Sequence, residues 1–161
     1  MSTSSKLCQL NGGCMGCCGH DFLSKKMIQK AIELNTTEFK TVDPHKEISL
    51  HAFRDRMPAY DLRYGVCRNL IESNKQLLCP LHPALNDGKD LRVGHCELNY
   101  MCPTAKLFET WKQEKQEKFI KFIESKKLDH LSYSMGMVNE KLLNEFYSQY
   151  LFVKVRSEND F

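Results

Sequence analysis

Four cysteines lie within eleven residues near the N-terminus, at Cys8, Cys14, Cys17 and Cys18. Thiolate sulfur is a soft donor that favours zinc and iron–sulfur centres. Zinc takes four ligands in a tetrahedron, and a cubane iron–sulfur cluster is also held by four cysteines. The glycines between these cysteines let the backbone turn tightly around an ion, because glycine readily adopts positive φ. The spacing therefore predicts a metal site in this loop, as a [4Fe–4S] cluster, for example, or as Zn²⁺.

A second group of candidate ligands follows in the middle of the chain. Cys79 and His82 are three residues apart, which is a common chelating interval, and His82 is the weaker candidate of the two. Cys102 directly precedes Pro103, where the start of a helix would favour the thiolate form. The alternative is that some of these cysteines are inert thiols in a core. The candidate metal ligands of this group are Cys67, Cys79, Cys96 and Cys102, with His82, and the histidines that would orient ligands are His20 and His95.

Arginines are frequent in the same middle segment. Positive charges around a metal centre would offset the negative charge that several thiolates bring to it. The alternative is that these arginines form a basic surface that faces solvent. No nucleophile, phosphate loop or pair of acids stands out, so the catalytic residues are unknown and enzymatic activity is left open. These arginines are Arg54, Arg56, Arg63, Arg68 and Arg92.

The composition is that of a folded domain. The chain has 161 residues, of which 42% are hydrophobic and 27% charged, enough to form one core. A net charge of +3 gives little support for nucleic-acid binding, and no apolar run approaches the roughly 18 residues of a membrane span. The first residues lack the apolar stretch of a secretion signal, so we expect a reducing, cytoplasmic setting in which clustered cysteines bind metal rather than form disulfides.

The first part of the chain must place these ligands with little regular structure. Residues 21–35 are expected to form a helix that Asp21 or Ser24 caps and that stops at Asn35. Two short strands are expected at FKTV, residues 39–42, and EISLHAF, residues 47–53. The rest of 36–102 reads as irregular, and such a long irregular stretch is reasonable if metal bonds cross-link it.

The remainder is expected to be mostly helical. Pro103 suits a first helical position, and apolar residues from Ala105 to Ile123 follow one face for about six turns. Gly136 interrupts the pattern, and Asn139 can cap a last helix. The expected fold is mainly α with irregular, metal-organised loops. A Cys-rich metal-binding region, 1–102, is followed by a helical region, 103–161, packed on it in one domain overall.

The cysteine pattern resembles the YkgJ-type, or CxxCxxCC, family of zinc- or iron-chelating domains, over about residues 8–102. Family members open with clustered cysteines, later show a cysteine before an apolar pair, and end on a cysteine near arginine. The resemblance implies a metal or iron–sulfur centre in a bacterial cytoplasmic protein. The segments that match are Cys14-Met15-Gly16-Cys17-Cys18 after Cys8, then Cys67-Arg68-Asn69-Leu70-Ile71, Cys79-Pro80-Leu81-His82-Pro83 and Arg92-Val93-Gly94-His95-Cys96, with Cys102 as an eighth ligand.

Three functions are compatible with these features. The first is a metal-binding protein in which thiolates hold an iron–sulfur cluster or zinc. The second is a cluster-dependent redox enzyme, and the third is a zinc-stabilised module that binds protein or nucleic acid. Nucleic acid is disfavoured because the charges of the expected long helix alternate in sign. We therefore expect a metal ion or cluster as ligand, a protein as the partner that the C-terminal helices would bind, and no membrane.

Overall fold

The computed structural model describes residues 5–158, with side chains as far as residue 150. About half of the chain is helical and the strands are few and short, which confirms a mainly α fold. The described helices and strands are η1 (Lys6–Gly12, 3₁₀), α1 (Lys25–Phe39), α2 (Glu47–Asp55), β1 (Leu62–Arg63), β2 (Val66–Cys67), β3 (Ile71–Ser73), β4 (Gln76–Leu78), η2 (Pro83–Leu85, 3₁₀), α3 (Pro103–Glu109), α4 (Gln113–Ser125), α5 (His130–Val138) and α6 (Lys141–Glu158).

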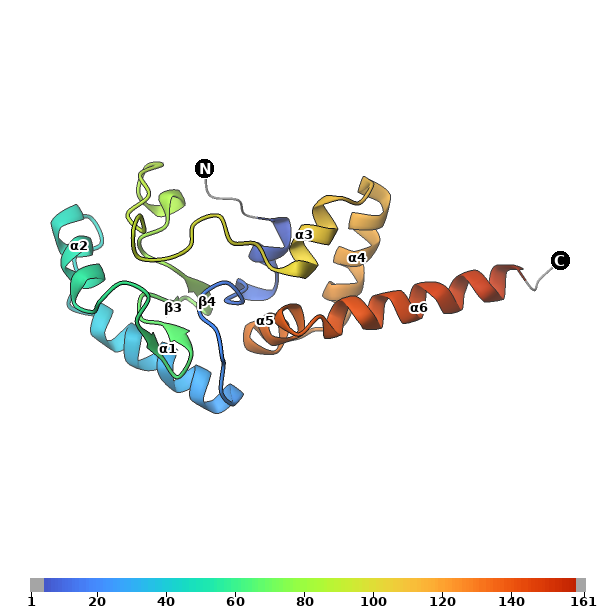
Figure 1. The fold of residues 1–161 in the computed structure, drawn as a ribbon, viewed down its shortest axis with the longest axis horizontal. Coiled ribbons are helices and arrows are strands. Elements are labelled where there is room, and N and C mark those ends of the chain that lie inside the picture. Colours follow the sequence, from blue (N-terminus) through green and yellow to red (C-terminus); the bar gives the residue numbers. More distant parts are fainter. Residues whose placement is uncertain (1–4, 159–161) are drawn as a thin grey trace.

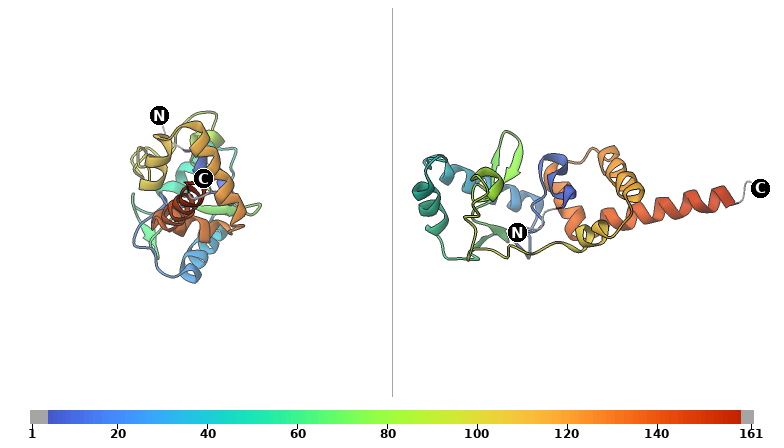
Figure 2. Two further views of the ribbon diagram at one scale, coloured as in Figure 1. Left: turned by 90° about the vertical axis from the view of Figure 1, so that its right-hand side faces the viewer. Right: turned by 90° about the horizontal axis from the view of Figure 1, so that it is seen from above.

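The elements are arranged along one long axis. Helices α1 and α2 and the two hairpins lie at one end, whereas α3 and α4 lie towards the other, with the N-terminal segment and α5 between them (Figure 1). Helix α6 runs outward from the body, as Figure 1 and the right-hand view of Figure 2 show. Within residues 5–158, no helix combines the length and apolar character that crossing a bilayer requires.

The first residues of the chain pack against its last helices. Leu7 on η1 is fully buried in one cluster with Phe108, Phe119 and Phe146. The hydroxyl of Tyr133, on α5, donates a hydrogen bond to the carbonyl oxygen of Leu7 at 2.6 Å. Apolar burial is the main stabilising contribution in such a cluster, so the N-terminal segment depends on the C-terminal helices for its position.

Two further clusters of buried apolar side chains lie in the rest of the body. One joins α1 to the hairpins, and the other lies under α2 and the segments that follow β4. The members of the first are Met15, Ile28, Ala31, Ile32, Val66, Leu70, Leu77 and Leu131. The members of the second are Leu50, Leu81 and Leu91.

Helix α1 begins where the sequence indicated but continues further. The Ser24 hydroxyl accepts a hydrogen bond from the backbone N–H of Met27, which confirms Ser24 as the cap. The expected stop at Asn35 is wrong, because the helix continues to Phe39. Asn35 is buried and donates to the carbonyl oxygens of Cys67 and Leu70, at 2.9 and 3.0 Å. Its amide therefore holds the hairpin region rather than ending its own helix.

Both expected strands are wrong. EISLHAF lies in α2, where Leu50 and Phe53 are buried on one face at helical spacing. FKTV is the end of α1 and a turn, in which the Val42 N–H donates to the Phe39 carbonyl. The strands lie instead in two tight hairpins, β1–β2 and β3–β4, whose turn residues have positive φ. Those turns are Tyr64-Gly65 and Asn74-Lys75.

The boundaries of the helices after residue 102 differ from those expected. Pro103 occupies the start of α3, as expected. The single six-turn helix is wrong, since α3 ends at Glu109 and α4 begins at Gln113. Trp111, in the bend, stacks on Phe146 with ring centroids 5.9 Å apart, so the bend is fixed by aromatic packing.

Gly136 lies inside α5 and does not interrupt it. A Cβ at this position would lie 2.8 Å from Cγ of Leu142, so glycine allows α6 to approach α5. The Asn139 side chain accepts a hydrogen bond from the Lys141 N–H at 3.0 Å, which confirms it as a cap for the last helix.

Candidate metal centre

All eight cysteines are free thiols, and they come from five parts of the chain. Cys8 lies on η1, and three more follow in the loop after it. Cys67 ends β2, Cys79 directly follows β4, and Cys102 is the residue that caps α3. Cys96 lies in the turn-rich segment between η2 and α3. Cys17 is exposed, whereas the other seven are half-buried.

The thiols are electrostatically coupled. Burial is the largest cause that raises the pKa of Cys8, Cys67 and Cys102, and negative charge on Cys17 raises each of them further. Burial is also the largest cause that raises the pKa of Cys14 and Cys96. Charge on Cys8 and then on Cys17 adds to it at Cys14, and charge on Cys67, Asp90 and Cys17 adds to it at Cys96. Cys17 is therefore the thiol whose negative charge affects most of the other cysteines.

Backbone pairing attaches the N-terminal loop to the first hairpin. The Cys67 N–H donates to the Cys18 carbonyl at 2.8 Å, and the His20 N–H donates to the Gly65 carbonyl at 3.0 Å. A Cβ on Gly19 would collide with the Gly65 carbonyl oxygen, so the two backbones approach more closely than a side chain at this position allows. Cys18 and Cys67 are thereby fixed next to each other.

The same loop packs between β4 and α5. A Cβ on Gly13 would lie 2.7 Å from the carbonyl oxygen of Leu77, and one on Gly16 would lie 2.8 Å from a methyl group of Val138. The Met15 N–H donates to the Ser134 hydroxyl at 3.0 Å. The glycines thus allow a thiol-bearing loop to pass through the interior of the fold.

Two sulfurs already accept backbone hydrogen bonds. The Gly16 N–H donates to Sγ of Cys14, and the Ala105 N–H donates to Sγ of Cys102, both at 3.4 Å. Such N–H donors favour the thiolate form and offset its charge. Burial nevertheless raises the pKa of Cys14 to about 12, so this sulfur stays protonated near neutral pH unless a cation displaces the proton.

Cys79 and Cys96 lie near a fixed arginine. Burial raises the pKa of Cys79 to about 12 and that of Cys96 to about 11, while the charge of Arg92 acts to lower both. The Arg92 guanidinium is held by Asp90 through hydrogen bonds of 2.8 and 2.7 Å. The Leu91 N–H donates to the Leu81 carbonyl at 3.1 Å, which ties the two cysteine-bearing segments together.

Cys17 differs from its neighbour in charge. A hydrogen bond with the Cys18 thiol lowers the pKa of Cys17 to about 7 despite burial, and the Arg92 charge lowers it further. The same hydrogen bond, together with burial, raises the pKa of Cys18. Near neutral pH the exposed Cys17 side chain is therefore partly ionised, while Cys18 stays a thiol.

Among the described residues, the thiols are not assembled as ligands. No group of three or more His, Cys, Asp or Glu side chains among residues 5–158 is arranged to hold a metal ion. A metal–thiolate site requires sulfurs about 2.3 Å from a common ion and deprotonated. The donor set fits a soft metal in type and number, and binding would require side-chain movement and loss of protons.

The candidate histidines have other partners. Nδ1 of His82 accepts a hydrogen bond from the Ala84 N–H at 3.1 Å, so His82 caps η2. Nε2 of His95 lies 3.1 Å from a carboxylate oxygen of Asp55. His20 is exposed and pairs with its neighbour Asp21. The cysteines are therefore the principal ligand candidates.

No protein-family model, curated protein or solved structure matches the chain. The resemblance to YkgJ-type domains stays a prediction.

Three residues that support the thiols were not anticipated. Asn35 anchors the carbonyl of Cys67, Tyr133 lies buried beside the thiols near η1, and Ser134 fixes the Cys-bearing loop at Met15. Only Asn35 had a signal in the sequence, because it is a polar residue that continues the apolar stripe of α1. The contacts of the other two depend on residues more than a hundred positions away.

The arginines of the middle segment converge on one carboxylate. Arg56 donates two hydrogen bonds to Glu38, at 2.9 and 2.8 Å, and Arg63 donates one to the other oxygen at 2.5 Å. Arg68 lies 3.6 Å from the same oxygen and 3.0 Å from Asp61. Burial is the largest cause that raises the pKa of Cys67, and the charge of Arg56 partly offsets it.

Replacing Glu38 by glutamine is expected to lower the free energy of unfolding by about 2 kcal/mol, because it leaves three arginines with one carboxylate fewer. Burial acts to raise the pKa of Glu38, but the bonds from Arg63 and Arg56 outweigh it and hold the pKa below its ordinary value. This contribution is therefore present above about pH 4.3 and lost as the pH falls through the lower, folded-state pKa. Urea unfolding at pH 7 and pH 3.5 measures it.

Glu114→Gln is the matched control. Glu114 forms an exposed pair with Lys118 at 2.6 Å, and its loss should leave the free energy of unfolding nearly unchanged because solvent screens such pairs. Equal effects of the two substitutions at pH 7 would contradict a structural role for the Glu38 cluster.

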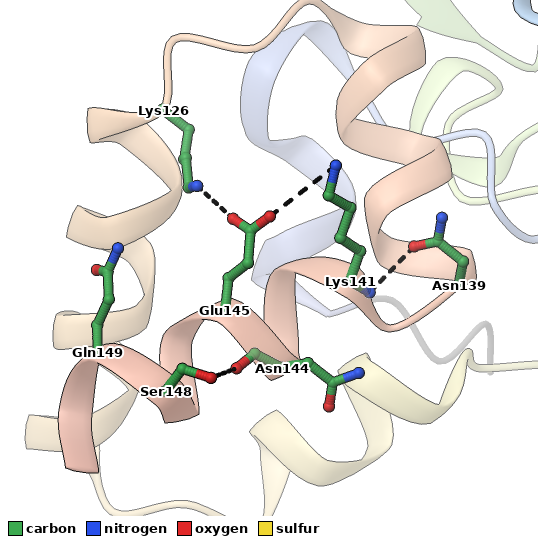
Figure 3. A pocket seen from close by; sticks show the side chains of 7 residues that line it. All are labelled: Lys126, Asn139, Lys141, Asn144, Glu145, Ser148 and Gln149. Atoms are coloured by element: carbon green, nitrogen blue, oxygen red, sulfur yellow. Dashed lines mark hydrogen bonds and ion pairs between the residues drawn. The ribbon is translucent and has the colours of Figure 1, made fainter. Parts of the chain in front are cut away.

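The surface hollows lie apart from the thiols. One is lined by residues of α6, by the turn after α5 and by Lys126, which directly follows α4, with Glu145 between Lys126 and Lys141 (Figure 3). A second lies around Trp111, Lys115 and Tyr150, where the Lys115 ammonium is 4.1 Å from the Trp111 ring centroid. Neither hollow is lined by a cysteine, so neither belongs to the candidate metal centre.

Proposed function

We propose that this chain is a metal-binding protein in which clustered cysteine thiolates hold an iron–sulfur cluster or zinc. Two observations support the proposal: the chain has eight free thiols, four of them within residues 8–18, and a backbone hydrogen bond joins Cys67 to Cys18. Each of the eight thiols has a pKa that another cysteine perturbs, after burial or through a direct hydrogen bond. Thiols that only filled space in a core would need no such grouping.

The surrounding residues are suited to thiolate ligands. Backbone N–H groups of Gly16 and Ala105 donate to sulfur, and Arg92 is fixed by Asp90 within electrostatic reach of Cys79. These groups would offset the negative charge that several thiolates bring to a metal. They would also keep ligands oriented while the thiol protons are released.

Iron–sulfur is favoured over a single zinc ion by the number of thiols. One structural zinc needs four ligands, and the chain offers eight. When bound, an iron–sulfur cluster would supply one-electron chemistry, whereas zinc would supply a rigid cross-link. The thiols are half-exposed and Cys17 is at the surface, so such a centre would lie near solvent.

The absorption spectrum of anaerobically purified protein tests the proposal. A broad band near about 400 nm, with iron and acid-labile sulfide in the preparation, is expected for an iron–sulfur centre. A colourless protein that contains zinc would overturn the iron–sulfur assignment but retain metal binding. Protein that carries no metal and takes up neither iron with sulfide nor zinc would contradict the proposal.

A further inference from the structure

We propose that Arg63 and Arg68, at the β1–β2 hairpin, bind a phosphate group, either as free phosphate or as part of a larger molecule. Guanidinium groups recognise phosphate through their charge and through N–H donors in fixed directions. The site uses arginines rather than thiols, so the inference does not rest on metal binding.

The hairpin holds the two guanidinium groups against one carboxylate. Arg63 ends β1, and Arg68 directly follows β2, whose Cys67 pairs with Leu62. Nη2 of Arg63 lies 2.5 Å from Oε1 of Glu38, and Nη2 of Arg68 lies 3.6 Å from the same oxygen. Two positive charges are therefore held next to each other.

Each of these two arginines keeps one buried N–H group without an acceptor. Within the part of the chain that the structure describes, neither Nη1 of Arg63 nor Nε of Arg68 has a hydrogen-bond partner. The two side chains are only 16% and 15% exposed. An unpaired buried donor costs free energy, and in a native fold such a group indicates a bound water or ion.

Arg56 provides a comparison within the same cluster. Its Nε, Nη1 and Nη2 atoms all donate hydrogen bonds, to Glu38 and to the carbonyl oxygens of Phe53 and Arg68. Arg56 is therefore fixed by the protein itself. The unpaired donors of the cluster belong to the two hairpin arginines.

The charges of the cluster favour an anion over water. Three guanidinium groups contact two carboxylates, those of Glu38 and Asp61, so one positive charge is not neutralised. A planar carboxylate matches the fork of a single guanidinium group. The diverging oxygens of phosphate can instead accept hydrogen bonds from two separate guanidinium groups, which is the arrangement of Arg63 and Arg68.

The carboxylates compete with the proposed ligand. Glu38 and Asp61 are about one third exposed, at 34% and 33%, whereas the unpaired N–H groups are enclosed. An incoming phosphate group would reach the arginines when one of these carboxylate side chains rotates outward. Removing the charge of Glu38 should therefore strengthen binding.

Calorimetric titration with inorganic phosphate, at an ionic strength held constant with chloride, tests the site. We expect saturable binding by the wild-type chain and about tenfold tighter binding by Glu38→Gln. Arg63→Lys keeps the charge but removes the Nη1 donor, and should weaken binding about tenfold. Arg54→Lys is the matched control, because Arg54 is similarly buried but pairs with Asp55, and its binding should be unchanged. Methyl phosphate as a second probe distinguishes the two sources: a site for phosphate groups of larger molecules accepts it, and a site for free phosphate excludes it.

Two outcomes would overturn the proposal. The first is an absence of phosphate binding by both the wild-type chain and Glu38→Gln, a comparison that holds even if Arg63→Lys does not fold. The second is equal binding by the wild-type chain and a folded Arg63→Lys, because charge attraction alone would then account for it. Far-UV circular dichroism monitors the fold of each variant. Either outcome would leave the proposed metal binding intact, since that proposal depends on the thiols.

Discussion

Exchange of Cys17 and Cys18 together for serine is expected to strip the metal from the chain and to loosen residues 1–100. The backbone of Cys18 is hydrogen-bonded to that of Cys67, and charge or hydrogen bonding from Cys17 affects six of the other cysteines. Serine is nearly isosteric but is a poor ligand for zinc or iron. Because metal binding in such sites contributes directly to folding, the melting temperature should fall with the metal content.

Metal analysis and amide hydrogen exchange measure the two parts of this result. Protection should fall in the loop around Met15 and in the β1–β2 hairpin, and should be retained at Phe119 in the helical core. His20→Gln is the control, since His20 is exposed and pairs only with Asp21. Unchanged metal content and melting in the cysteine variant would remove the N-terminal loop from the site.

Gly19→Ala is expected to be the most damaging single substitution outside the cysteines. Its φ of +140° is unfavourable for alanine, and the new Cβ would collide with the carbonyl oxygen of Gly65. A backbone atom cannot rotate away as a flexible side chain does, so the hairpin and the loop must separate. We expect the free energy of unfolding to fall by about 3 kcal/mol or more, or the melting temperature to fall by roughly 6–12 °C.

Gly94→Ala is the control that distinguishes the effect of the Cβ collision from the effect of backbone strain alone. Gly94 also has positive φ, +80°, but nothing lies within 4 Å of the position that a Cβ would occupy there. Its substitution should cost about 1 kcal/mol, the strain alone. Similar urea midpoints for the two variants would show that the contact between Gly19 and Gly65 does not hold the loop.

Local signals in the sequence identified the ends of several helices. Ser24, Pro103 and Asn139 each act through a neighbouring backbone group, so their roles can be inferred from a few residues. The mainly α fold follows from the same signals. The errors arose where a residue's partner lies far along the chain.

Asn35 and Trp111 illustrate those errors. Asn35 resembled a helix stop, yet its amide bonds to carbonyls 32 and 35 residues away. Trp111 fitted the apolar face of one long helix, but it lies in a bend where it stacks on Phe146. Neither tertiary partner can be inferred from periodicity.

The candidate site was foreseen by composition but not by grouping. Sequence proximity placed Cys8, Cys14, Cys17 and Cys18 in one group and the later cysteines in another. The structure instead brings Cys102 to the core cluster on which Cys14 packs, and pairs the backbone of Cys18 with that of Cys67. Backbone contacts between distant segments, which the spacing of cysteines does not encode, decide which thiols meet.

The hydrogen bond from Tyr133 to Leu7 has a consequence for biosynthesis. It joins residues 126 positions apart, and ribosomes add about 5–20 residues per second. The first four thiols therefore emerge on the order of ten seconds before the helix that completes their surroundings. During that interval they are open to oxidants and to adventitious metals. Under the proposed function, delivery of the correct metal would follow completion of the chain rather than precede it.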